Sequence, residues 1–194
     1  DSLQTLIKDL DGPKLKGWII DVRNNNGGAE MPMIAGLGPL LDKDNVYYGI
    51  DKSGTIRTLS YYRNGAYYNV DDPKDSLSAP IVATKVKYQL HNPKLPVIIL
   101  TSGKTASSAE AVVAIFRGQP NVKIVGEKTN GLTTINSFEF LEDNSVLNLS
   151  MANMAGRDKK IYVQGIAPDL LITPMDSERD DIVLQNGIAL IVAE

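Results

Sequence analysis

Apolar residues recur along the chain with two different periods. Residues 1–10 carry them at the three- and four-residue spacing of one helix face, at Leu3, Leu6, Ile7 and Leu10. Further helical patterns are found at 30–41, 107–117 and 179–193. The largely apolar runs typical of buried strands are 15–22, 95–100 and 122–126. Because buried strands alternate with helices, the sequence predicts an α/β fold.

A second type of segment interrupts this alternation. Residues 46–70 hold six of the eight tyrosines in strand-like runs separated by "DKSG" and "RNG", which predicts a small antiparallel insertion, a hairpin or a three-strand meander. The tyrosines are expected either to pair across strands or to form a substrate-facing lid. Later strands are predicted at 137–141, 145–154 and 160–163.

Composition and charge exclude several classes of function. The net charge is −3 with scattered positive residues, so we expect no nucleic-acid partner. The chain has no cysteine and only one histidine, His91, so we expect no metal site and no cofactor. The absence of cysteine suits a secreted or membrane-anchored bacterial protein, which indicates an extracytoplasmic location. No apolar run approaches the roughly 20 residues that span a membrane.

The stretch "LTSGKTASSAE" at 100–110 invites two interpretations. A nucleotide-binding loop needs a glycine five residues before Gly103, but that position is Ile98, inside the predicted strand. The other interpretation concerns the serines, which lie where a strand gives way to a helix. They either cap the helix or place a nucleophile beside free backbone N–H groups.

The stretch "WIIDVRNNNGG" at 18–28 is also open to two interpretations. It is either an ordinary Asn-Gly turn or a loop whose glycine backbone approaches a substrate carbonyl and donates an N–H group. In the second case Gly27 and Gly28 are the residues concerned.

Four stretches together resemble the tail-specific, or C-terminal processing, serine peptidases. They are "GWIIDVRNNNGG", "VIILTSGKTASSAEAVVAIFRG", "VKIVGEKTNGL" and "GIAPDL", in the family's order and spacing over about residues 15–172. The resemblance implies a ClpP/crotonase-like superhelix of ββα units that cleaves peptide bonds through an acyl-enzyme. It implies Ser107 as nucleophile, Gly27, Gly28 and the N–H of Ser108 as oxyanion hole, and Glu110 in a supporting role.

The sequence departs from this family where a general base is expected. The resemblance to the lysine-using branch would place the base at position 132, which is Leu132. Lys128 corresponds to a structural position, and His91 lies on the far side of the strand, about 20 Å from Ser107. The sequences of the motifs resemble the histidine-using, tricorn-like branch more closely. This resemblance implies a base before residue 1. The third catalytic residue is unassigned, with Gln164 and Asp158 as candidates.

We therefore expect residues 1–194 to form a single peptidase core whose chain begins inside a helix and lacks an N-terminal part. Its partner would be a peptide or protein substrate, and a membrane anchor or other domains would precede residue 1. The alternatives are a non-catalytic module of the same fold that binds a peptide or an apolar ligand, and a crotonase-type acyl-CoA enzyme. A serine in the nucleophile position argues against the last of these.

Overall fold

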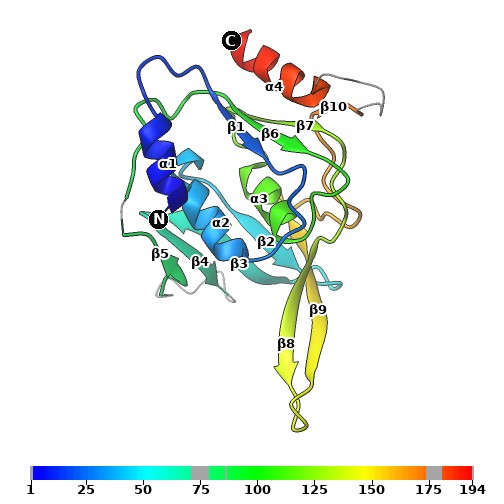
Figure 1. Cartoon of the computed structure of the whole chain (residues 1–194). Helices are drawn as coiled ribbons and strands as arrows, with labels where there is room; N and C mark the ends of the chain where they lie inside the picture. Colours follow the sequence, from blue (N-terminus) through cyan, green and yellow to red (C-terminus); the bar gives the residue numbers. More distant parts are fainter. Residues whose placement is uncertain (1, 71–78, 86, 174–180, 194) are drawn as a thin grey trace.

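The computed structural model describes residues 2–70, 79–85, 87–173 and 181–193. It is a mixed α/β structure with one parallel and one antiparallel sheet, which confirms the predicted fold class (Figure 1). No helix among the described residues is long and apolar enough to cross a bilayer.

The parallel sheet forms the centre of the molecule. Its strands, in spatial order, are β1 (Trp18–Asp21), β6 (Val97–Thr101), β7 (Val122–Gly126) and β10 (Leu170–Leu171). Alternate residues of β6 face opposite layers. Ile99 belongs to the cluster that contains helix α3, whereas Ile98 and Leu100 pack with Val183 of helix α4. Burial on both faces explains why "VIIL" is continuously apolar.

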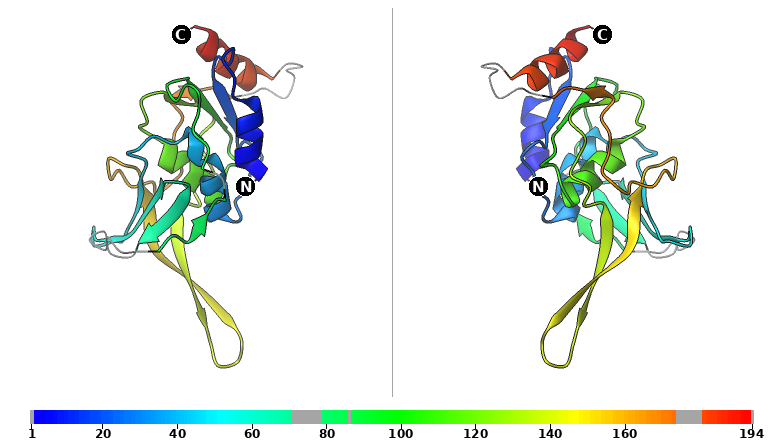
Figure 2. Two further views of the ribbon diagram at one scale, coloured as in Figure 1. Left: turned by 90° about the vertical axis from the view of Figure 1, so that its left-hand side faces the viewer. Right: turned by 90° about the vertical axis from the view of Figure 1, so that its right-hand side faces the viewer.

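Helices cover both faces of this sheet (Figures 1 and 2). Within the described ranges the α-helices are α1 (Ser2–Leu10), α2 (Glu30–Leu37), α3 (Ser108–Phe116) and α4 (Ile182–Val192), and a short 3-10 helix, η1 (Gly38–Leu40), follows α2. Helix α3 is buried from Ala109 to Phe116, and it packs against α2 and the antiparallel sheet. The predicted helices are thus found, although the first residues of the one predicted at 179–193 lie outside the described residues.

The antiparallel sheet contains the tyrosine-rich segment. Its strands, in spatial order, are β5 (Val82–Ala83), β4 (Ala66–Val70), β3 (Ile56–Arg63), β2 (Tyr47–Ile50), β9 (Val146–Ala155) and β8 (Thr134–Phe140). Strands β2 to β4 form the expected meander, and the rings of Tyr61 and Tyr68 stack across it with centroids 4.8 Å apart. The cross-strand interpretation therefore holds for this pair.

The strand predicted at 160–163 is wrong. In its place the structure has one isolated bridge, between Ala155 and Ile161, which follows a tight turn at 156–159. Lys159 has a positive φ of 61°, and its N–H donates to the carbonyl of Gly156. Because this turn is followed by Gly165, also at positive φ, the backbone leaves the sheet before a ladder can extend.

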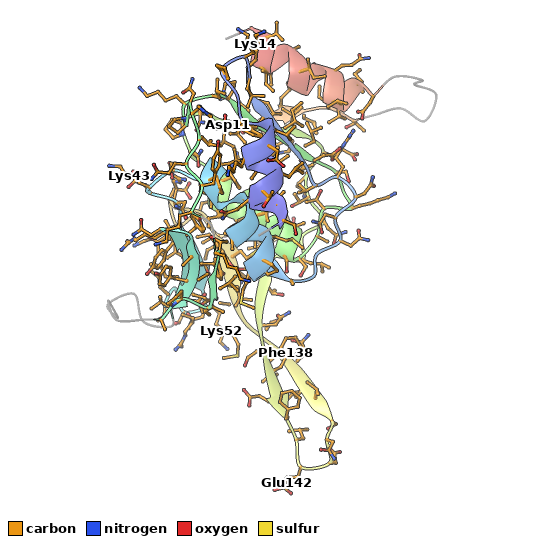
Figure 3. All side chains as sticks on the ribbon, turned by 60° about the vertical axis from the view of Figure 1, so that its left-hand side comes forward. Asp11, Lys14, Lys43, Lys52, Phe138 and Glu142 are labelled. Atoms are coloured by element: carbon orange, nitrogen blue, oxygen red, sulfur yellow. The ribbon has the colours of Figure 1, made fainter. Side chains whose placement is uncertain are left out.

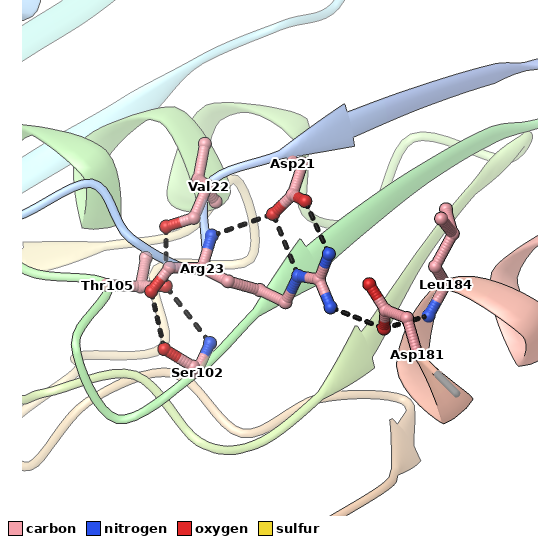
Figure 4. A network of polar contacts seen from close by, with 7 residues as sticks. All are labelled: Asp21, Val22, Arg23, Ser102, Thr105, Asp181 and Leu184. Atoms are coloured by element: carbon pink, nitrogen blue, oxygen red, sulfur yellow. Dashed lines mark hydrogen bonds and ion pairs between the residues drawn. The ribbon is translucent and has the colours of Figure 1, made fainter. Parts of the chain in front are cut away.

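Arg23 connects the carboxyl end of β1 to helix α4 (Figure 4). Its guanidinium bonds to Asp21 on one side and to Asp181 on the other, at 2.6 Å in each case. Asp181 also caps α4, since its side chain accepts a hydrogen bond from the N–H of Leu184. Nearby, the hydroxyl of Thr105 donates to the carbonyl of Val22. The polar residues after β1 therefore hold both α4 and the turn that leads to Ser107.

The Arg23–Asp181 ion pair is expected to make the stability of the folded protein sensitive to acid. The hydrogen bonds from Arg23 lower the pKa of Asp181 below its ordinary value. A lowered folded-state pKa means that the stabilisation is complete above the unfolded pKa of about 3.9 and is lost as the pH falls through the folded value. We expect Asp181→Asn to remove this part of the acid sensitivity, by less than about 1 kcal/mol because the pair is partly exposed.

Urea unfolding over a pH series measures the effect, with Asp44→Asn on the exposed surface as the matched control. Equal loss of stability at low pH in the wild type and in Asp181→Asn would contradict it.

Candidate active site

Ser107 occupies the sharp turn between strand β6 and helix α3. Its φ is 54° and its ψ is −119°, a conformation that residues with a side chain rarely adopt. Such strain persists only where the surroundings enforce it, and it clusters at functional sites. The nucleophilic serines of α/β-hydrolases lie on a comparable strand-to-helix turn, where the hydroxyl is exposed. The side chain of Ser107 is correspondingly half-buried rather than enclosed in the core.

Glu110 anchors the backbone of this turn. Its carboxylate is fully buried and accepts a hydrogen bond from the N–H of Ser107 at 2.9 Å. The other carboxylate oxygen accepts from the hydroxyl of Thr129 at 2.6 Å and from the N–H of Gly131 at 2.9 Å. Three donors satisfy the charge that burial would otherwise penalise. Glu110 therefore fixes the backbone of Ser107 and ties it to the 129–131 loop.

The glycine loop after β1 packs directly against the serine. Gly27 has a φ of +109°, and a Cβ on it would lie 2.8 Å from the Cβ of Ser107 and 3.0 Å from the carbonyl oxygen of Ala106. Only glycine fits this approach. Asn25 fixes the loop, because its side-chain oxygen accepts from the N–H of Gly27 at 3.0 Å and its carbonyl accepts from the N–H of Ala106 at 3.1 Å.

Two N–H groups beside Ser107 remain free within the described part of the chain. One belongs to Gly28 and the other to Ser108, the first residue of α3. The hydroxyl of Ser108 donates to the carbonyl of Gly28 at 2.7 Å, so the loop and the helix start are linked. Both groups lie in the positive potential of the helix N-terminus. The geometry gives Gly27 a packing role, since its own N–H is bound to Asn25.

A buried cluster that sequence reasoning did not identify anchors the far end of this loop. Glu30, at the start of α2, accepts hydrogen bonds from the hydroxyls of Tyr47 and Tyr67. Burial, together with the charge of Glu30, raises the pKa of both phenols, so they stay protonated and donate. These two tyrosines belong to the meander but face α2, which no spacing in the sequence signals.

The structure does not bring a lysine or histidine to Ser107 within the described residues. His91 lies at the amino end of β6, where its Nδ1 is 3.1 Å from a carboxylate oxygen of Asp11, whereas Ser107 follows the carboxyl end of that strand. Lys128 and Leu132 are both exposed, on either side of the 129–131 loop. No hydrogen bond joins the hydroxyl of Ser107 to a basic side chain in this part of the protein.

The two candidates for a third catalytic residue lie in different places. Asp158 accepts from the N–H of Lys160 in the turn after β9, which packs beside Arg117 at the C-terminal end of α3. That end is about 13 Å from Ser107 along the helix, so Asp158 does not join the site. Gln164 is exposed, but its backbone packs against Gly131 in the loop that Glu110 holds.

An apolar cavity of about 330 Å³ adjoins the glycine loop. It lies between α1, β1 and α2, and its lining includes Asn25, Met33 and Val112. A cavity of this composition accommodates an apolar side chain of a ligand. Among the described residues, no cluster of three or more potential metal-ligating side chains occurs.

A strained serine at a helix start, beside free backbone donors, is the arrangement of serine hydrolases that form acyl-enzymes. The model of peptidase family S41 matches residues 1–172, and the chain belongs to this family.

Individual relatives agree with this assignment. The chain is 32% identical over 171 residues to the nisin-resistance protein of Lactococcus lactis subsp. lactis, covering 88% of this chain and 50% of that protein. It is 27% identical over 169 residues to the carboxy-terminal processing protease CtpA of Bacillus subtilis (strain 168), covering 87% and 31%. It thus spans half or less of the length of these two relatives.

Solved structures show the same fold. A lipoprotein from Streptococcus agalactiae superposes with a TM-score of 0.71 at 28% identity, over 99% of this chain and 58% of that one. The photosystem II D1 C-terminal processing protease superposes with a TM-score of 0.62 at 20% identity, over 98% and 41%.

Proposed function

We propose that this chain is the catalytic core of a serine peptidase in which Ser107 is the nucleophile. The observation that carries the proposal is the strained backbone of Ser107, held against Gly27 on one side and by Glu110 on the other. A merely structural helix cap requires neither this strain nor a bare glycine backbone against it.

The chemistry follows from the geometry. The Oγ of Ser107 attacks the carbonyl carbon of the scissile peptide bond, and a general base takes the hydroxyl proton. The oxyanion that forms accepts hydrogen bonds from the free N–H groups of Gly28 and Ser108, which are aimed by the glycine loop and the start of α3. Collapse breaks the C–N bond, the amine leaves with the proton from the base, and water then hydrolyses the acyl-enzyme.

We further propose that a histidine outside residues 1–194 is the base. Within the described residues, the one histidine, His91, bonds to Asp11. It precedes the amino end of β6, whereas Ser107 follows the carboxyl end. The matching relatives extend well beyond the region that this chain covers, so they have room for the residue. The base would complete a site in which Glu110 positions the nucleophile without taking its proton.

The position of the base is testable in the full-length protein. We expect His91→Ala and Lys128→Met to leave the turnover of a peptide substrate within about twofold of wild type, because neither side chain is bonded to Ser107. Alanine replacement of each histidine outside residues 1–194 in turn is expected to identify one that lowers turnover by about 10⁶-fold. Loss of turnover in Lys128→Met would instead place the base in the 127–133 loop and contradict the proposal.

We propose that the protein encounters its peptide substrate outside the cytoplasm. The chain contains no cysteine, one relative is described as a lipoprotein and another is named for resistance to nisin. Nisin is therefore the first peptide to test. Incubation with the full-length protein, followed by mass spectrometry, is expected to show truncated nisin with the wild type. Intact nisin, with other peptides cleaved, would reject this substrate but leave the peptidase in place.

A further inference from the structure

Strands β8 and β9 form a two-stranded arm that projects from the body of the molecule (Figures 1 and 2). The arm pairs with the rest of the sheet only at its base, where Ile50 to Tyr48 of β2 pair with Asn153 to Ala155 of β9. From Asn136 to Ser150, the two strands pair only with each other in the described structure. A free hairpin of this kind is marginally stable in water unless something covers it.

Both faces of the arm carry exposed apolar side chains. Phe140 is opposite Val146 and Phe138 is opposite Asn148, so the two phenylalanines share one face. Leu147 and Leu149 alternate with these positions and lie on the other face. Phe138 is 60% exposed and Phe140 is 81% exposed. Figure 3 shows Phe138 on the arm just below the body and Glu142 at the far tip. Polar residues alternate with these apolar ones, for example Asn148 on the first face and Glu139 on the second.

All charged residues of the arm are acidic. Between Leu132 and Gly156 the sequence contains Glu139, Glu142 and Asp143 but no lysine or arginine. A surface that combines apolar side chains with uncompensated negative charge attracts a partner with apolar side chains and positive charge. The same carboxylates oppose binding to an anionic lipid surface.

The arm begins beside the proposed nucleophile. The N–H of Gly131 and the N–H of Ser107 bind the same carboxylate, that of Glu110, and β8 starts three residues after Gly131. Among the strands that the structure describes, β8 is the last of its sheet, so its outer edge presents N–H and C=O groups without a partner strand there. An extended chain that pairs with this edge would be led toward the site and would set its side chains against both faces of the arm.

We propose that the β8–β9 arm binds the peptide substrate as an added strand, and that it selects peptides with apolar residues and positive charge. This inference rests on the proposed peptidase function and specifies its substrate class. It assigns a binding role to a segment that lies outside the catalytic residues.

The test uses the full-length protein with the double variant Phe138→Ser, Phe140→Ser. Because these side chains are exposed, the thermal midpoint should stay unchanged. We expect the KM for a lysine-containing apolar peptide to rise at least tenfold, with kcat and the rate at which a fluorophosphonate labels Ser107 unchanged. The matched control is Leu171→Ser, Val192→Ser, which removes apolar residues of similar exposure, 67% and 74%, from β10 and α4. It should leave KM unaltered.

A second variant isolates the charge. Glu139→Gln, Glu142→Gln, Asp143→Asn is expected to raise the KM of the lysine-containing peptide severalfold at low salt but not that of its norleucine-substituted analogue. Unchanged KM in both arm variants, with normal labelling of Ser107, would overturn the arm proposal and leave the peptidase proposal standing. Absence of labelling in the wild type would instead reject the peptidase itself.

Two further outcomes would also overturn the arm proposal. One is a wild-type dimer that becomes a monomer in the phenylalanine variant without a change in KM, since the arm would then bind a second copy. The other is wild-type co-sedimentation with vesicles of anionic phospholipid that the variant loses, which would make the arm a lipid contact.

Discussion

Ser107→Ala is expected to abolish both fluorophosphonate labelling and peptide cleavage by the full-length protein. The substitution removes the atom that attacks the scissile carbonyl but keeps the N–H groups of Gly28 and Ser108. Turnover should therefore fall by about 10⁶-fold, leaving only what the oxyanion donors and substrate binding supply. Mass spectrometry of the labelled protein locates the modified residue, and a continuous peptide assay gives the rate.

The adjacent serine supplies the control for this experiment. Ser108→Ala keeps its backbone N–H but loses the hydroxyl that donates to the carbonyl of Gly28. We expect this variant to retain labelling at Ser107, at a reduced rate. Two results would show that Ser107 is not the nucleophile. One is labelling of the Ser107→Ala variant at Ser108, and the other is a full-length wild-type protein that the fluorophosphonate does not label.

Gly27→Ala is expected to lower kcat by about 10²–10³-fold, the range seen when one oxyanion-hole donor is lost. The new Cβ would lie 2.8 Å from the Cβ of Ser107, at a φ of +109° that alanine adopts only with strain. Either the glycine loop or the serine must then move. In both cases the free N–H of Gly28 no longer points where the oxyanion forms.

Gly103→Ala is the matched control, because a Cβ added at this position would meet nothing within 4 Å, although Gly103 belongs to the turn before Ser107. It should keep near wild-type kcat. Thermal unfolding of both variants separates a misplaced loop from a failure to fold. A folded Gly27→Ala protein with full kcat would mean that the loop has no part in catalysis.

Periodicity predicted much of the fold because burial leaves a direct mark on the sequence. The run "VIIL" in β6 is apolar at every position because helices cover both sheet faces. The spacing in α1 predicted a helix correctly but not its buried side, since Ile7 is buried whereas Leu3, Leu6 and Leu10 are exposed. The segment at 160–163 escaped this logic. Its residues have strand propensity, but the positive φ of Lys159 and the nearby glycine turn the backbone out of the sheet.

The candidate site was partly visible for a related reason. Ser107, Gly27 and Gly28 could be identified because a serine at a strand-to-helix turn and adjacent glycines in a loop are recognisable sequence patterns. The buried bonds between Glu30 and the two tyrosines left no such mark, because residues 17 and 37 positions apart come together only through folding. The preference for the histidine-using branch stays a prediction.

The sequence by itself determined the α/β class, the family and the serine that lies at the end of β6, because local patterning and motif order are properties of the chain. Only the tertiary structure decided which N–H groups remain free, since Asn25 takes the donor of Gly27 and leaves those of Gly28 and Ser108. It also decided that the apolar residues of 136–150 stay uncovered. Hydrogen-bond partners and exposure depend on contacts between distant segments, which no local pattern contains.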